Sequence, residues 1–128
     1  MTRNALKVIS NAMDSLGFEY GFARYNKNPI VYPYWVGEYL ENASTAENGY
    51  TTTTFMLTGY HRGKEWLDLE QQKESIENFF NKVSGKTVMA EDGSAVAVFY
   101  SNGQILPTMD AELKRIRINL DIHEWSVK

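Results

Sequence analysis

One stretch of the chain, YTTTTFMLTGYHRG over residues 50–63, constrains the fold most strongly. Threonine is β-branched, so its side chain has few rotamers and favours a pleated sheet over a flexible linker. The run continues without a break into Phe55, Met56 and Leu57, and successive side chains of a strand point to opposite faces. We therefore predict a long strand over residues 50–61, which extends past the core at its threonine end and enters the core at Phe55.

Two further segments favour long strands. The segment 30–40, IVYPYWVGEYL, is rich in β-branched and aromatic residues. Pro33 has no N–H to donate, so this strand lies at an edge or begins its pairing after Pro33, and Gly37 is interpreted as a β-bulge. Near the C-terminus, apolar residues occupy every second position between polar ones, which predicts a strand with one buried and one wet face. These apolar residues are Ile116, Ile118, Leu120 and Ile122.

Apolar residues at helical spacing predict two helices. The first covers residues 5–16 and ends at Gly17, where a C-terminal cap is expected. The second covers residues 68–84, with Asp68 and Gln71 in the spacing of a capping box. The apolar stripes are Leu6, Ile9, Met13 and Leu16 in the first helix, and Leu69, Ile76, Phe79, Phe80 and Val83 in the second.

Between the second helix and the last strand, the sequence predicts a hairpin. The segment 95–100, AVAVFY, favours a strand, and Asn102-Gly103 is a strong signal for a two-residue hairpin turn. The return strand, 104–106, is stopped by Pro107.

The predicted fold class is α+β, with elements in the order α-β-β-α-β-β-β. We expect an antiparallel sheet in which strand 50–61 pairs with 31–40, and two helices packed on one face. The 128 residues suit a single domain spanning 1–128. The helices are expected to contact the sheet through Ile9, Met13, Ile76 and Phe80.

Composition and motifs argue against several functional classes. There is no cysteine, which excludes disulfides, thiolate zinc sites and cysteine nucleophiles, and suits a reducing cytoplasm. His61 and His123 have no second ligand at a metal-binding spacing, and no catalytic or nucleotide-binding motif occurs. The net charge of −3 disfavours nucleic-acid binding, and no segment approaches the ~20 apolar residues of a membrane span. We therefore predict no enzyme activity and no catalytic, cofactor or metal site.

Three features instead indicate contact surfaces. Tyrosine and tryptophan are concentrated in the first predicted hairpin, and these residue types are enriched at interfaces. A basic turn precedes the second helix, and a long polar loop spans residues 41–49. The alternatives are packing against the helices for the aromatic residues and a solvated turn for the basic ones. The candidate interface residues are Tyr32, Tyr34, Trp35, Glu38, Glu41, Tyr60, Arg62, Lys64, Arg115 and Arg117.

Taken in order, these segments resemble a known family. A helix is followed by YPYWVGEYLE, a polar loop, FMLTGYHRG, the helical LDLEQQKESIENFFN, a hairpin and IRINLDIHEW. This pattern resembles the tail terminator, or tail-to-head joining, proteins of long-tailed, non-contractile (siphovirus-type) phages and prophages. The resemblance covers nearly the whole chain, and its strongest piece is LTGYHRG at residues 57–63.

The resemblance implies a structural protein of the virion that is made in the cytoplasm of the host bacterium. Its subunits form a hexameric ring that caps the tail tube and docks onto the head connector, or stopper, protein. DNA passes through the ring without sequence-specific binding. We expect the basic side chains at Arg62, Arg115 and Arg117 to meet Glu38 or Glu41 of the next subunit in the ring.

Two other interpretations are compatible with the sequence. The first is another neck or tail-completion protein of the same virion, which would share size and composition. The second is an NTF2-like ligand-binding protein or enzyme, in which a curved sheet and helices enclose an aromatic pocket. A deep pocket that contains a histidine or a carboxylate would favour the NTF2-like interpretation.

Overall fold

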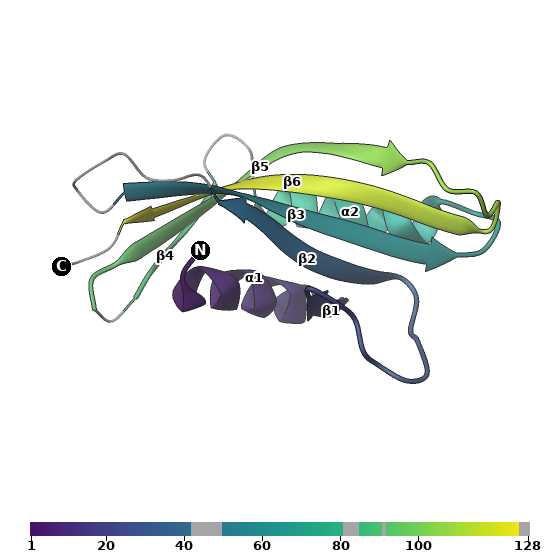
Figure 1. Ribbon diagram of the computed structural model, residues 1–128, viewed down its shortest axis with the longest axis horizontal. Coiled ribbons are helices and arrows are strands. Elements are labelled where there is room, and N and C mark those ends of the chain that lie inside the picture. The colour runs from purple at the N-terminus through teal and green to yellow at the C-terminus, as the bar shows by residue number, and fades with distance from the viewer. Residues whose placement is uncertain (42–49, 81–84, 91, 126–128) are drawn as a thin grey trace.

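A computed structural model describes residues 1–41, 50–80, 85–90 and 92–125 of the chain. The described residues form two helices and a six-stranded mixed sheet, so the fold class is α+β (Figure 1). The elements follow one another as α1 (Arg3–Leu16), β1 (Glu19–Phe22), β2 (Tyr34–Glu41), β3 (Tyr50–Arg62), α2 (Leu67–Phe79), β4 (Lys86–Met89), β5 (Ala95–Leu106) and β6 (Leu113–Trp125).

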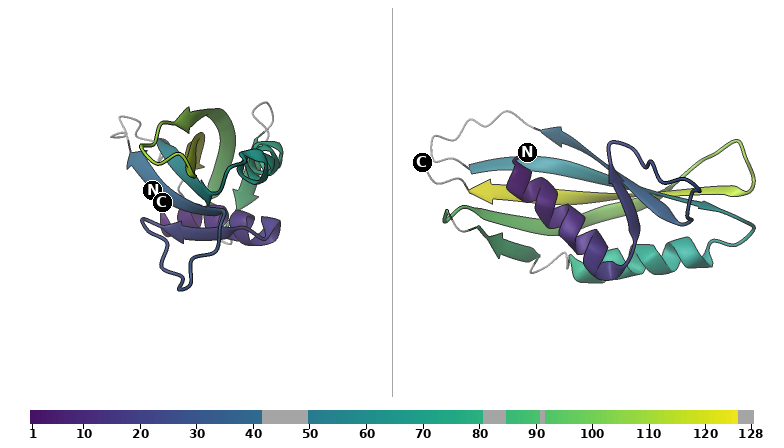
Figure 2. Two further views of the ribbon diagram at one scale, coloured as in Figure 1. Left: turned by 90° about the vertical axis from the view of Figure 1, so that its right-hand side faces the viewer. Right: turned by 90° about the horizontal axis from the view of Figure 1, so that it is seen from below.

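The strands lie in the order β1-β2-β3-β6-β5-β4. The β1–β2 pair is parallel and the other four pairs are antiparallel, so the prediction of a purely antiparallel sheet is wrong for this edge. The sheet is strongly curled and leaves both helices on the same face (Figure 2). The predicted antiparallel pairing of the two long N-terminal strands is confirmed, with Tyr34 opposite Tyr60 and Glu41 opposite Thr53.

The centre of the sheet is the β3–β6 pair, in which 13 residues of each strand are aligned. Phe55 and Leu57 of β3 are fully buried, as the alternation predicts, and so is every second residue from Ile116 to Ile122 in β6. Thr53 is also buried, so the core begins one alternation earlier than the sequence indicates. The Thr53 hydroxyl has no hydrogen-bond partner there among the described residues, so its burial has a cost.

Helix α1 follows the prediction closely. The Thr2 hydroxyl accepts a hydrogen bond from the Ala5 N–H at 3.2 Å, and Gly17 ends the helix in the left-handed conformation. Ile9 and Met13 are fully buried against the sheet. Glycine suits the cap because a side chain disfavours a positive φ, which is 75° at Gly17.

Helix α2 begins at Leu67 and ends at Phe79, earlier than predicted. Asp68 therefore lies inside the first turn and forms no capping box, although its negative charge is favourable near the N-terminus of a helix. Leu69, Ile76 and Phe80 are fully buried, as expected for the apolar stripe. Val83 lies outside the described residues.

The predicted hairpin at Asn102-Gly103 is wrong. The segments 95–100 and 104–106 belong to one continuous strand, β5, which pairs with β6 along its length and carries a β-bulge between Tyr100 and Asn102. The Asn102 side chain accepts a hydrogen bond from Asn119 Nδ2 at 2.7 Å. A Cβ at Gly103 would lie 2.7 Å from the Tyr100 hydroxyl, so this glycine permits close packing and forms no turn.

The short strands β1 and β4 were not predicted, because four residues are too few to show a period of two. Their presence makes the predicted order α-β-β-α-β-β-β incorrect. Strand β2 begins immediately after Pro33, as one of the two predictions for that proline requires. Gly37 is in register with Leu57 and forms no bulge; a Cβ there would lie 2.5 Å from the Phe55 ring.

We expect Ile76→Ala to lower the free energy of unfolding by about 2–5 kcal/mol, because it removes buried atoms from the core-facing side of α2 and leaves a cavity. Denaturant unfolding measures the change. Leu67→Ala in the same helix is the control, because Leu67 is exposed and should change stability little. Equal losses in the two variants would contradict this description of the core.

Candidate interaction surfaces

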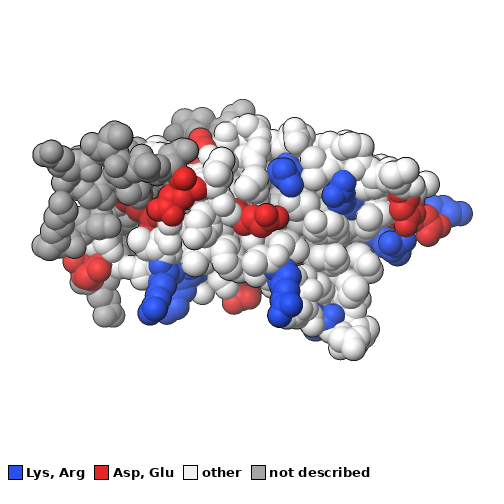
Figure 3. Space-filling view, viewed as in Figure 1, with Lys and Arg blue, Asp and Glu red and all other residues white. Residues whose placement is uncertain are grey.

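The face of the sheet opposite the helices remains uncovered by any described helix, and we call it the helix-free face. Because side chains alternate along each strand, the residues between the core positions of β2, β3, β6 and β5 point to this face. Figure 3 is seen from this side and shows several lysine and arginine side chains in its right-hand half, together with acidic side chains at the right-hand end. That end holds the starts of β2 and β6 and the end of β3 (Figure 1).

Four tyrosines pack together at this end, and we call them the tyrosine stack. The ring centroids of Tyr25 and Tyr34 are 4.4 Å apart, and those of Tyr34 and Tyr60 are 5.0 Å apart, with both pairs stacked. Tyr32 completes the group at 5.5 Å from Tyr34 in a tilted arrangement. Partial burial raises the pKa of Tyr34 above its ordinary value.

The stack is fixed by polar contacts at its outer side. The Tyr25 hydroxyl donates to Glu19 Oε1 at 2.8 Å, and Lys27 Nζ lies 3.0 Å from the same oxygen. The Glu19 hydrogen bond also raises the pKa of Tyr25, after burial as the main cause. Tyr25 was not predicted as a surface residue, because it lies in a loop where no periodicity indicates which way a side chain points.

The basic turn makes contacts within the chain. Arg62, the last residue of β3, donates from Nη1 to Oδ2 of Asp110 in the turn between β5 and β6, at 2.9 Å. Arg62 is the main cause that holds the pKa of Asp110 below its usual range, and the N–H of Glu112 contributes further. Lys64 is exposed. Asp110 is 48 residues from Arg62 in the sequence, so no local pattern predicts this pair.

Two further arginines lie beside the stack on the helix-free face. Arg115 stands opposite Tyr60 in the β3–β6 register, and its Nη2 donates to the Pro107 carbonyl at 2.6 Å. Arg117 stands opposite Thr58, and its Nε donates to the Thr58 hydroxyl at 3.5 Å. Both guanidinium groups are therefore held along the sheet and keep their positive charge at this end.

The acidic residues of the face lie farther along the strands. Glu38 is opposite Met56, and Asp121 is opposite Thr54, so both point to the helix-free face, and both are exposed. Glu41 is opposite Thr53 and points to the helix side, where its Oε2 lies 2.7 Å from the Met1 amino group. Glu38 and Asp121 thus lie along the helix-free face away from Arg115 and Arg117, while Figure 3 shows acidic side chains at the arginine end as well.

Trp35 was predicted as a candidate interface residue, but its side chain is not at the surface. It is fully buried, and its indole Nε1 donates to Gln72 Oε1 of α2 at 2.8 Å. Gly59 makes room for the indole, because a Cβ there would lie 2.7 Å from the ring. The structure therefore brings together Tyr32, Tyr34, Tyr60, Arg62, Arg115 and Arg117, and places Glu38 farther along the same face. The polar loop predicted at 41–49 lies outside the described residues, apart from Glu41.

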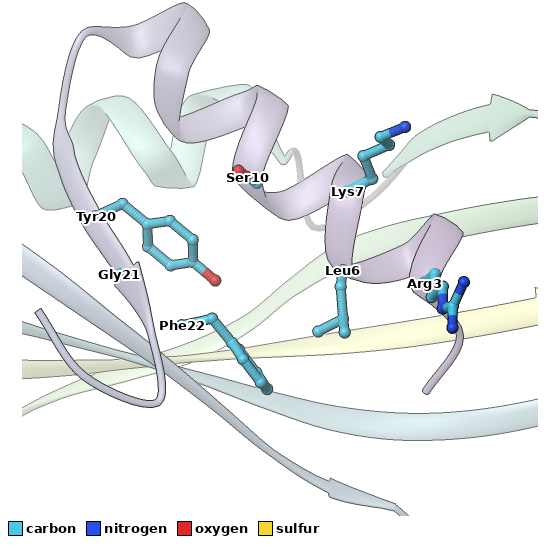
Figure 4. A pocket seen from close by; sticks show the side chains of 7 residues that line it. All are labelled: Arg3, Leu6, Lys7, Ser10, Tyr20, Gly21 and Phe22. Carbon is cyan, nitrogen blue, oxygen red and sulfur yellow. The ribbon is translucent and has the colours of Figure 1, made fainter.

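A groove of about 400 Å³ lies between α1 and β1 (Figure 4). Leu6, Tyr20 and Phe22 line its apolar part, and Arg3 and Lys7 border it. No histidine or carboxylate lines this groove, and the described residues contain no cluster of three or more histidine, aspartate or glutamate side chains that could hold a metal. None of the described helices is long and apolar enough to cross a membrane.

We expect Arg62→Gln to raise the pKa of Asp110 toward its ordinary value, because the nearest positive charge is removed. Since the folded pKa of Asp110 is lowered, the Arg62 contact stabilises the fold at neutral pH and is lost as the pH falls through that pKa. An NMR titration of the carboxyl carbon measures the shift. Lys64→Gln is the control and should leave the titration of Asp110 unchanged; a matching shift there would contradict the pairing.

A comparison of the chain with known protein families and with curated proteins finds no match. The assignment of a function therefore depends on the residues and their geometry.

Proposed function

We propose that the protein is a structural subunit of a ring that caps the tail tube of a long-tailed phage and joins it to the head connector. The resemblance of the sequence to tail terminator proteins supports this proposal, and it extends over nearly the whole chain. The structural observation that carries it is the placement of Arg115 and Arg117 at one end of the helix-free face and of Glu38 and Asp121 farther along it, with Arg62 at the arginine end paired to Asp110.

A ring requires a heterologous interface, in which one patch of a subunit meets a different patch of the next. A face that is positive at one end and negative at the other supplies two such patches, because the positive end of one copy attracts the negative part of its neighbour. Two positive ends repel each other, so an arrangement with like ends together is disfavoured. Opposite charges meet in head-to-tail association and also in an antiparallel two-fold dimer, so the ring itself is proposed from the resemblance to tail terminator proteins.

The tyrosine stack supports the same interpretation. Tyr34 and Tyr60 lie next to Arg115, so a partner that contacts this end meets rigid aromatic area and a guanidinium together. Aromatic residues and arginine are the residue types that contribute most to binding energy at interfaces. The tail tube protein and the head connector are the further partners expected for such a ring. An overall net charge of −3 suits a lumen through which DNA must slide.

Another neck or tail-completion protein of the same virion remains the second candidate, because separated charge serves any ring in the tail–head junction. The location of the protein separates the two candidates: a terminator binds tail ends before heads join, and a neck protein binds the head portal.

We expect deletion of the gene to leave tails that lack a cap, vary in length and fail to join heads, with wild-type protein restoring joining. Electron microscopy of the lysate and the infectious titre measure the outcome. Normal tails attached to heads would show that the proposed function is wrong. Tails of normal length beside heads with unfinished portals would instead identify the neck protein.

We expect Arg117→Glu to weaken ring assembly, because like charges brought together at an interface cost several kcal/mol. The double variant Arg117→Glu with Glu38→Arg should restore assembly, since the attraction returns with its sign exchanged. Arg24→Glu, a reversal at an exposed loop position, is the control for net charge. The measurement is the amount of this protein on purified tails. If the double variant assembles no better than the single variant, Glu38 is not the partner of Arg117.

A further inference from the structure

The two sides of the sheet are stepped. Strand β1 pairs with the first half of β2, from Tyr34 to Gly37, so the second half at 38–41 has only β3 as a strand partner among the described residues. Strand β4 pairs with β5 from Ala95 to Val98, so residues 101–106 have only β6 as a described strand partner. Each side of the sheet therefore has a covered part and an open part.

The backbone of β2 is oriented for pairing at its open part. Ala23 N–H donates to the Gly37 carbonyl at 2.8 Å, so the backbone groups of Gly37 point away from β3. Because this direction alternates along a strand, the N–H and C=O of Tyr39 also point away from β3. Within the described residues, the β1–β2 pairing ends at Gly37, and no other backbone hydrogen bond reaches Tyr39 from that side.

Exposed apolar side chains lie at both open parts, alongside the charged Glu38 and Glu41 of β2 and the polar stretch 101–104 of β5. Charged residues at an open edge oppose pairing with another chain. Here the exposed fractions are 44% for Phe22, 39% for Tyr39, 63% for Leu40 and 58% for Ile105. Exposed apolar residues beside unpaired backbone favour strand addition.

These side chains point to matching faces. Ile105 is opposite the buried Ile116, so it points to the helix side of the sheet, and Tyr39 is opposite the buried Phe55 and does the same. The groove between α1 and β1 lies on that side too, next to the open part of β2, with Phe22 at its border (Figure 4). An added strand at β2 would bring one apolar side chain to this groove.

We propose that the open end of β5 (101–106) in one copy of this chain pairs antiparallel with the open end of β2 (38–41) in the next copy. In this joint the partner's Ile105 packs beside Tyr39 and Phe22 at the groove. The inference rests on the proposed ring, for which it names the contact. Antiparallel pairing follows from the topology, because β5 runs opposite to β2 within one sheet and the joint keeps the helices of both copies on one side.

Charge complementarity identifies a second copy as the occupant. Gln104 and Leu106 pair with Arg117 and Arg115 of β6, so the end of β5 lies one strand from both arginines. Placed beside β2, these arginines stand two strand spacings from Glu38, or about 10 Å between backbones, on the same helix-free face. Arginine side chains reach most of that distance. The joint therefore brings the positive end of one copy next to the negative part of the other.

Cysteine cross-linking tests the joint, because the wild-type chain has no cysteine. We expect the pair Ile105→Cys with Tyr39→Cys, after oxidation, to give a ladder of linked subunits on a non-reducing gel. The pair Met89→Cys with Tyr39→Cys is the control, because Met89 is similarly exposed on the open edge of β4 and should give single subunits. Both pairs are tested on isolated tails and on concentrated purified protein.

A ladder from the Ile105 pair alone supports the joint. A ladder from the purified protein supports the joint even if gene deletion shows that the proposed tail function is wrong. No ladder in either sample, or an equal ladder from the control pair, overturns the joint. If tails carry the protein without this ladder, the ring stands and the joint is wrong.

A variant without disulfides provides an independent test. We expect Ile105→Lys to abolish the oligomers trapped by an amine-independent cross-linker, because a lysine would meet Arg3 and Lys7 at the groove. Met109→Lys in the neighbouring exposed turn is the control and should retain them. Thermal unfolding confirms that both variants fold, as their exposure predicts. Retained oligomers in folded Ile105→Lys would overturn the proposal.

Discussion

The pairing of β3 with β6 is the constraint on which the rest of the structure depends. Both strands have 13 residues, and their alternation places Phe55 and Leu57 beside Leu120 and Ile118 on one face. That face is fully buried because α1 and α2 cover it, and Ile9 and Ile76 reach it from the two helices. Strands β2 and β5 then add to the two free edges of this pair. A one-residue slip between β3 and β6 would move every core residue to the helix-free face.

The same alternation determines the helix-free face. Once the core register is set, Tyr60, Arg115 and Arg117 have no position other than the opposite side of the sheet. Arg115 Nη2 donates to the Pro107 carbonyl and Arg117 Nε to the Thr58 hydroxyl, although Arg115 Nε is buried without a partner among the described residues. Aromatic stacking and these hydrogen bonds hold the side chains in place before any partner binds. Such preorganisation lowers the entropy lost on association, which is consistent with the proposed contact between copies of the chain.

Long periodic segments could be predicted from the sequence, and short or non-local features could not. The strands at 50–61 and 115–123 and the helix at 5–16 show their period over many residues, and the structure contains all three. Four-residue strands have too few alternations, which is why β1 and β4 were missed. Asn102-Gly103 has the composition of a hairpin turn, yet β6 offers a long edge, and continuous pairing along it outweighs the local preference.

The same limits apply to the prediction of the candidate interface residues. Tyr60 lies on the face of its strand opposite Phe55, so its position follows from alternation, whereas the face of Tyr34 does not follow from its own strand. Trp35 is adjacent to Tyr34 and must point the other way, but an aromatic-rich run alone does not show which of the two faces is dry. Asp110 and Tyr25 lie in loops, and they join the surface through contacts that depend on the tertiary fold.

The missed strands have a further consequence for the proposed joint. A long open edge can pair with a neighbour in several registers, which leads to aggregation. Strand β1 occupies the edge of β2 as far as Gly37, so a partner strand added at 38–41 stops where β1 ends. Strand β4 limits the other partner in the same way, because it covers β5 up to Val98. Two four-residue strands with little core of their own thus limit the registers open to the proposed joint, and a ring of identical subunits closes only if every joint has the same register.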